Sequence, residues 1–150
     1  GLTTGALFLL VGMIYERRHT RRIADYGGLG AVMPLFAGAF LFISLASIGL
    51  PGLNGFVGEL LILLGAFETQ PVAVVIGASG IVLGAVYMLM VVQRVFWNPL
   101  LIEANRNLPD LTWRETAAFA PLGAAMIWIG VHPTPLLNLS EAAIRRLIGG

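Results

Sequence analysis

The sequence predicts an all-α fold: a polytopic bundle of transmembrane helices, one of which is discontinuous. Hydrophobic residues make up 57% of the 150 residues and charged residues only 11%, whereas charged residues are roughly a quarter of an ordinary soluble domain. The apolar residues form long blocks along the whole chain, unlike the single short block of a secretory signal peptide. The net charge of +1 argues against a nucleic-acid-binding surface, and the lack of cysteine argues against a thiolate metal site.

Four transmembrane segments are expected within residues 1–135, at about 2–16, 32–67, 72–97 and 115–132. The first apolar run has about fourteen residues where a span needs roughly twenty, so we expect it to be the end of a longer helix. It is followed by four arginines, a pattern typical of an anchor at the cytoplasmic membrane surface: Arg17, Arg18, Arg21 and Arg22.

The two later segments have clear ends. As a helix, segment 72–97 would be about 39 Å long, enough to cross a hydrocarbon core of roughly 30 Å with some tilt. A polar loop follows it as far as Glu115, and segment 115–132 stops where Pro133 and Pro135 cannot continue a helix. Residues 136–150 have an amphipathic pattern, so we expect a surface segment there.

Segment 32–67 is too long for one straight span and leaves almost no residues for a hairpin between two. Its 36 residues would form a helix of about 54 Å. Near its middle the chain reads GLPGLNG. Proline removes a backbone donor and glycine weakens a helix, so we expect a helix break at Gly49, Pro51, Gly52 and Gly55.

The distribution of arginines distinguishes one broken span from two spans. If segment 32–67 crosses the membrane once, seven arginines lie on one side and the opposite loop, residues 68–71, has none. If it crosses twice, the first four arginines and the other three face opposite sides. The positive-inside tendency therefore favours one crossing. A broken span is tolerated where its backbone faces protein or a water-filled cavity, which indicates an ion or substrate path.

Glu59 is the one charged residue of segment 32–67 and the leading candidate for chemistry. Nine residues from Glu68, it would lie about 13 Å deep, close to the bilayer midplane. An ionised carboxylate at a helix centre costs about 2.5 to 3.5 kcal/mol on insertion scales, so Glu59 is expected to exchange a proton as a relay group. The alternative is a structural Glu59 that makes one fixed hydrogen bond or ion pair.

His19 stands among the arginines that follow the first segment and is the second candidate. Because histidine titrates near neutral pH, His19 could help protons to enter from the cytoplasmic face. The alternative is a solvated histidine in the headgroup region.

Two strings carry a family resemblance: GLTTGALFLLVGMIYERRHTRR at residues 1–22 and ASIGLPGLNGFVGELLILLGAF at residues 46–67. There the sequence resembles the antiporter-like membrane subunit M of the proton-pumping NADH:quinone oxidoreductase, respiratory complex I, whose mitochondrial counterpart is chain 4. The resemblance covers essentially the whole chain, as the last four of fourteen transmembrane helices. It implies a fold of inverted repeats that contains this broken helix, with Glu59 on the proton path.

The resemblance also implies a function, which is proton translocation across the membrane in response to quinone reduction elsewhere in the complex. The chain would be part of a translocating enzyme without a redox centre of its own, since FMN and iron–sulfur clusters are expected in other subunits. Its partners would be neighbouring antiporter-like membrane subunits, the lipid bilayer and protons, with quinone involved only indirectly and no nucleic acid.

The expected location is the bacterial inner (plasma) membrane rather than the mitochondrial inner membrane, because the chain has arginine but no lysine, as in GC-rich bacteria. Two alternative functions stay open. One is a subunit of a multisubunit cation/proton antiporter, although such relatives commonly carry lysine at the position of Glu59. The other is a non-conducting membrane scaffold.

Overall fold

Every regular element in the computed structural model is helical over the part that it describes, residues 1–139. This confirms the predicted all-α class. The predicted surface segment 136–150 lies mostly outside the described residues, the last of which, 134–139, are helical. The elements in chain order are α1 (Leu2–Arg18), η1 (Ile23–Asp25), α2 (Leu29–Val32), α3 (Pro34–Ser47), α4 (Asn54–Phe67), α5 (Pro71–Val92), the π-helical η2 (Gln93–Trp97), η3 (Glu103–Asn105) and α6 (Trp113–Val131).

The residues at the helix boundaries explain where the helices begin and end. α1 ends where His19 adopts the left-handed conformation, with φ 52°, and donates its backbone N–H to the Tyr15 carbonyl. α3 and α5 begin at Pro34 and Pro71, because proline suits the first helical position. The residue before a proline avoids the helical conformation, so Met33, with φ −127°, separates α2 from α3.

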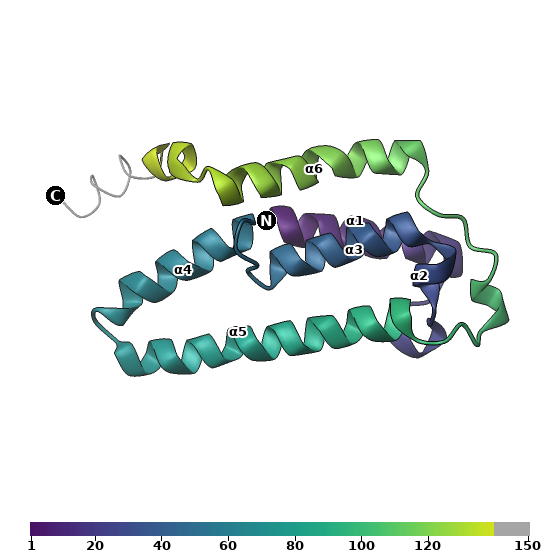
Figure 1. Ribbon diagram of the computed structural model, residues 1–150, viewed down its shortest axis with the longest axis horizontal. Coiled ribbons are helices and arrows are strands. Elements are labelled where there is room, and N and C mark those ends of the chain that lie inside the picture. Colours follow the sequence, from purple (N-terminus) through teal and green to yellow (C-terminus); the bar gives the residue numbers. More distant parts are fainter. Residues whose placement is uncertain (140–150) are drawn as a thin grey trace.

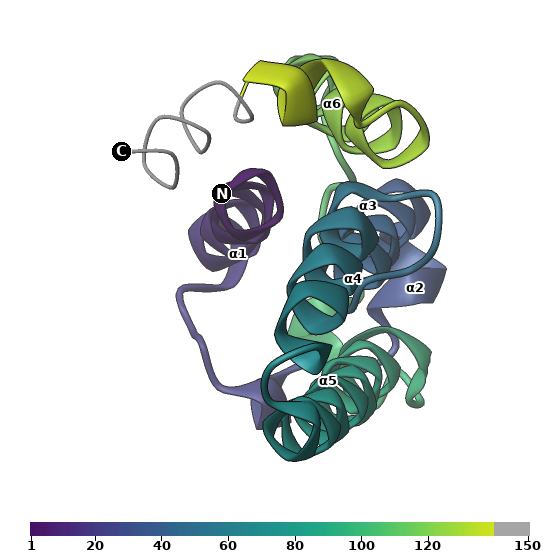
Figure 2. The same ribbon diagram turned by 90° about the vertical axis from the view of Figure 1, so that its left-hand side faces the viewer.

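The long helices lie roughly along one axis of the molecule (Figure 1). α3 and α4 follow one another toward the end at which the chain turns into α5, and α5 runs back. Viewed from the end, α3 and α4 lie between α5 and α6, with α1 to one side (Figure 2). The loops that follow α1 and η2 therefore meet at one end, and the turn between α4 and α5 lies at the other.

The core surrounds α3 and includes residues from α1, α2, η2 and α6. Leu10, Phe36, Ile43, Phe96 and Met126 are among its buried side chains. By contrast, α4 and α5 expose large apolar side chains, such as Ile62 at 71% and Val72 at 73%. Pro71–Trp97 is long and apolar enough to span a membrane alone, whereas Pro34–Ser47 and Asn54–Phe67 are shorter apolar helices.

The start of α3 is fixed by groups from distant parts of the chain. Both carboxylate oxygens of Asp110 accept hydrogen bonds, from the backbone N–H groups of Leu35 and Phe36, at 2.9 Å each. Arg17, at the end of α1, bonds the Asp110 carbonyl at 3.2 Å and pairs with Glu115 of α6 at 2.7 Å. These contacts tie α3 to α1 and α6 at one end and so help to place its other end, where the chain leaves the helix.

Candidate functional site

Residues 48–53, between α3 and α4, form an interruption in which two tight turns follow one another. Gly49 has φ 76° and Leu50 donates its backbone N–H to the Leu45 carbonyl at 3.0 Å, the pattern of a glycine-terminated helix end. Leu53 then bonds the Leu50 carbonyl at 3.1 Å around Pro51 and Gly52, with φ 93° at Gly52. α4 begins at Asn54 with no side-chain cap.

Glu59 reaches back from α4 to this interruption. A Cβ atom built on Gly49 would overlap the carboxylate oxygen Oε2 of Glu59. Glu59 itself is half-buried. Gly49 therefore has two roles: glycine suits its left-handed backbone, and its missing side chain leaves the space that the Glu59 carboxyl occupies.

Close backbone contacts fix the interruption on two sides. The Cα atom of Gly55 packs so closely on the Ala46 carbonyl oxygen that a Cβ there would overlap it. On α6, a Cβ at Gly130 would overlap the backbone at Gly52 and Leu53. Glycines thus allow α4 and α6 to approach the interruption closely.

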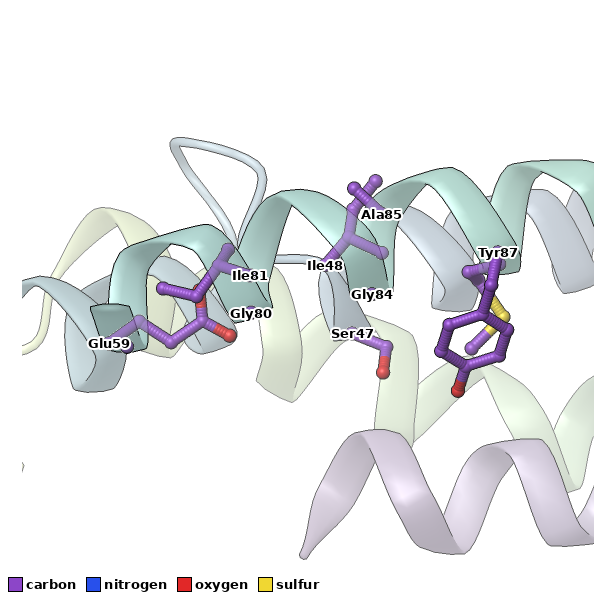
Figure 3. Close-up of a pocket in the computed structure, with 10 residues that line it drawn as sticks. Ser47, Ile48, Glu59, Gly80, Ile81, Gly84, Ala85 and Tyr87 are labelled. Carbon is purple, nitrogen blue, oxygen red and sulfur yellow. The ribbon is translucent and has the colours of Figure 1, made fainter. Parts of the chain in front are cut away.

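A groove of about 330 Å³ runs from Glu59 along α5. Figure 3 shows Glu59 toward one end, Tyr87 toward the other and Ser47, at the end of α3, between them. Gly77, Gly80 and Gly84 of α5 line the groove, and a Cβ on any of them would meet no atom within 4 Å in the described chain. We call this feature the Glu59 groove.

The polar side chains of the Glu59 groove have no partners within residues 1–139. Glu59 forms no ion pair there, and neither it nor the hydroxyls of Ser47 and Tyr87 makes a hydrogen bond. Ordered water bridges such groups when a site is polar and roomy. Within the same range, no three histidine, aspartate, glutamate or cysteine side chains cluster as metal ligands would. The chemistry available to these groups is proton transfer and hydrogen bonding.

The helix ends around Glu59 also carry partial charges of opposite sign. Unpaired N–H groups make the start of a helix positive, and unpaired carbonyls make its end negative, equivalent to about half a unit charge each. Glu59 lies in α4 and its carboxyl lies beside the end of α3. The Glu59 carboxyl therefore lies where the end of one helix meets the start of the next.

Comparison with known proteins decides the family. The family model described as NADH:quinone oxidoreductase/Mrp antiporter, transmembrane, matches residues 1–84. The chain belongs to this family. Together with the relatives named next, this match confirms the predicted resemblance.

Relatives in this antiporter family are similar to the chain over almost all of its residues. NADH-quinone oxidoreductase subunit M of Rhodobacter capsulatus is 44% identical over 148 residues, which are 99% of this chain and 29% of that protein. Subunit M of Mycobacterium tuberculosis is 43% identical over 144 residues, 96% of this chain and 26% of that protein. The NADH-ubiquinone oxidoreductase chain 4 of Marchantia polymorpha is 39% identical over 148 residues, covering 99% and 30%. The chain thus spans less than a third of these relatives.

A solved structure agrees with the family. A chain of respiratory complex I from Thermus thermophilus with bound NADH superposes with a TM-score of 0.78 at 39% identity, over 87% of this chain and 27% of that one. The arrangement of helices described above is therefore similar to part of a complex I chain.

The candidate site around Glu59 contains some of the predicted residues and not others. Glu59 lies together with the glycines and the proline of the interruption. His19 lies exposed at the end of α1, where its ring is edge-on to Tyr15 with the two ring centroids 5.9 Å apart. His19 is thus at the arginine-rich end, away from α4 (Figure 1). Ser47 and Tyr87 were missed. Their signal was weak, a hydroxyl directly before the interruption and a polar tip in an otherwise apolar helix.

Proposed function

We propose that this chain is a proton-translocating part of a membrane subunit of an NADH:quinone oxidoreductase, in which Glu59 takes up and releases a proton. One observation carries the proposal: the Glu59 carboxyl lies against Gly49 at the interruption, at the edge of a groove, without a partner in the described chain. Ionisable side chains within transmembrane segments are rare and usually have a function. Membership of the NADH:quinone oxidoreductase/Mrp antiporter family supports proton translocation as the reaction.

In this proposal α3 and α4 form one discontinuous span and α5 crosses back. Three features support it: the shared direction of α3 and α4, the turn that leads into α5, and the apolar exposure of α4 and α5. Arg17, Arg94 and Arg114 then lie at the same membrane face. The chain is embedded in a membrane with several spans, and a bacterial inner membrane fits its arginine-rich, lysine-free composition.

The interruption would let Glu59 hold or release its proton at modest cost. As a carboxylate it can accept hydrogen bonds from backbone N–H groups or water, and as a neutral acid it can donate to a carbonyl at the end of α3. Charge on neighbouring groups would shift the balance between the two forms. Water held by the Ser47 and Tyr87 hydroxyls would carry the proton along the Glu59 groove.

The rest of the reaction belongs to the wider enzyme. Electron transfer from NADH to quinone would take place in other subunits, with FMN and iron–sulfur clusters as their cofactors. Neighbouring antiporter-like membrane subunits would couple that chemistry to Glu59. This chain supplies the protonatable group and the broken helix around it.

The test is NADH-driven proton pumping by membrane vesicles whose full-length parent protein carries Glu59→Gln. Glutamine keeps the size and hydrogen bonding of the side chain but cannot ionise. Glu68→Gln is the matched control, because Glu68 is an exposed carboxyl at the end of α4. We expect pumping, and the NADH oxidation coupled to it, to collapse only in Glu59→Gln, in complexes that assemble normally.

Other results would select other functions. Pumping at the parental level in Glu59→Gln would make Glu59 a packing residue and this segment a scaffold. Sodium-dependent proton exchange without NADH would instead identify a cation/proton antiporter.

A further inference from the structure

A small apolar pocket lies at the arginine-rich end of the molecule, distinct from the Glu59 groove. Its volume is about 110 Å³, and α1, α3, the end of α5, η2 and residues 20–26 surround it. Phe36, Phe40 and Phe96 line it, with ring centroids 5.2–6.3 Å apart. Sites for drug-sized ligands enclose about 300–1,000 Å³, so this pocket suits a smaller apolar group, such as a few methylenes of a hydrocarbon chain.

Arg21 brings a positive charge to this apolar pocket. It lines the pocket together with Thr20 and Tyr26. With Val11 it also lines a second hollow of about 260 Å³ on α1, and its guanidinium stacks 4.7 Å from the Tyr15 ring centroid. Arg21 and Val11 therefore stand where two hollows meet.

The charge of Arg21 is not neutralised within the described chain. Across residues 1–139, neither Arg21 nor Arg22 forms an ion pair, and neither side chain makes a hydrogen bond. Glu16 and Asp25 are the acidic residues nearest in sequence, and the Asp25 carboxylate accepts a hydrogen bond from the Thr20 hydroxyl at 2.6 Å. Two guanidinium groups thus remain available to an external anion.

We propose that this pocket binds part of the acyl chain of an anionic phospholipid whose phosphate is held by Arg21, with Arg22 beside it. Such a lipid joins a hydrocarbon chain to a phosphate, as the structure joins an apolar pocket to an unpaired guanidinium. Arginine binds phosphate through strong paired hydrogen bonds. Basic pockets between membrane helices are typical sites for anionic headgroups. The inference depends on a membrane location and not on proton transfer at Glu59.

The test uses the intact complex with its full-length parent protein, in phosphatidylcholine vesicles that contain phosphatidylglycerol with a photoreactive diazirine in its acyl chain. After illumination, mass spectrometry locates the label. We expect label on residues 11–14 and 91–96, displaced by unlabelled phosphatidylglycerol but not by added phosphatidylcholine. Loss of one arginine near a charged membrane surface is expected to lower binding roughly fivefold, so Arg21→Gln should lower labelling by that factor.

Two further variants separate the site from general surface charge. Arg106→Gln is the matched control, because Arg106 is an exposed arginine of the loop after η2, and it should leave labelling unchanged. Val11→Trp fills the point where the hollows meet without changing the charge, and it should also lower labelling. NADH oxidation by each complex shows that it has assembled, and if Arg21→Gln does not assemble, Val11→Trp decides.

Several results would overturn the proposal. Equal labelling by a phosphatidylcholine probe, or equal losses in Arg21→Gln and Arg106→Gln, would leave only non-specific attraction. Displacement of the probe by inorganic phosphate would indicate a phosphate site without a lipid chain. An absence of label on both segments would mean that another part of the parent protein fills the pocket.

Discussion

The Gly49→Ala substitution tests whether the interruption positions the Glu59 carboxyl. The added Cβ would overlap Glu59 Oε2. Because this atom is the end of a flexible side chain, the carboxyl can move away while the fold is kept. The substitution therefore displaces the proposed proton carrier without changing its chemistry.

The Gly49→Ala substitution should have two separate effects, a loss of stability from backbone strain and a displacement of the Glu59 carboxyl. The left-handed conformation costs a non-glycine residue roughly 1–2 kcal/mol of stability, and Gly49 adopts it with φ 76°. Gly52 is a matched control, because its φ is 93° but a Cβ there would meet no atom within 4 Å. Both alanine variants should lose similar stability, and only Gly49→Ala should displace Glu59.

The assay is NADH-driven proton pumping in vesicles, with complex assembly measured alongside. Misplacement of a reacting group by about 1 Å can lower a rate about a hundredfold, so we expect Gly49→Ala to pump at least roughly tenfold more slowly than Gly52→Ala. Equal pumping by the two variants, at equal assembly, would refute the positioning role of Gly49.

Substitutions at three other positions test the packing of the helices through thermal unfolding of the purified parent protein. Gly130→Ala would drive a Cβ into the backbone at Gly52 and should cost about 1–3 kcal/mol; an unchanged midpoint would contradict this contact. Asp110→Ala removes the cap of α3 and should cost about 0.5–2 kcal/mol; Asp110→Asn should recover only part of this, because its amide nitrogen cannot accept the second hydrogen bond. The hydrogen bond from Arg17 lowers the pKa of Glu115, in the polar first turn of α6, from 4.5 to about 2. Because this pKa is lower in the folded state, the pair stabilises the fold fully above pH 4.5 and loses that effect as the pH falls through about 2, a dependence that Glu115→Gln should abolish.

Local rules account for much of what could be predicted from the sequence. Helix ends follow from proline and glycine, so Pro71 begins α5 and Gly49 ends α3 through properties of single residues. The all-α class and the family resemblance are confirmed. Glu59 stood out because a lone charge in an apolar segment is costly.

The contacts and site residues that the sequence did not predict depend on long-range contacts. Asp110 caps α3 from 75 residues away, and no local pattern identifies such a partner. Arg17 was expected to be a membrane-surface anchor, yet it also joins α1 to the Asp110 loop and to Glu115. Tyr87 borders the Glu59 groove only because α5 packs beside α4. These features depend on tertiary packing, which a single sequence does not encode locally.

The most direct test of the central claim is whether Glu59 changes its protonation while the enzyme works. Infrared difference spectra of the intact complex, recorded before and after reduction with NADH, report the carbonyl stretch of a protonated carboxyl group. We expect a band that shifts in heavy water, disappears in Glu59→Gln and persists in Glu68→Gln. Identical difference spectra for the parent complex and Glu59→Gln would contradict this expectation.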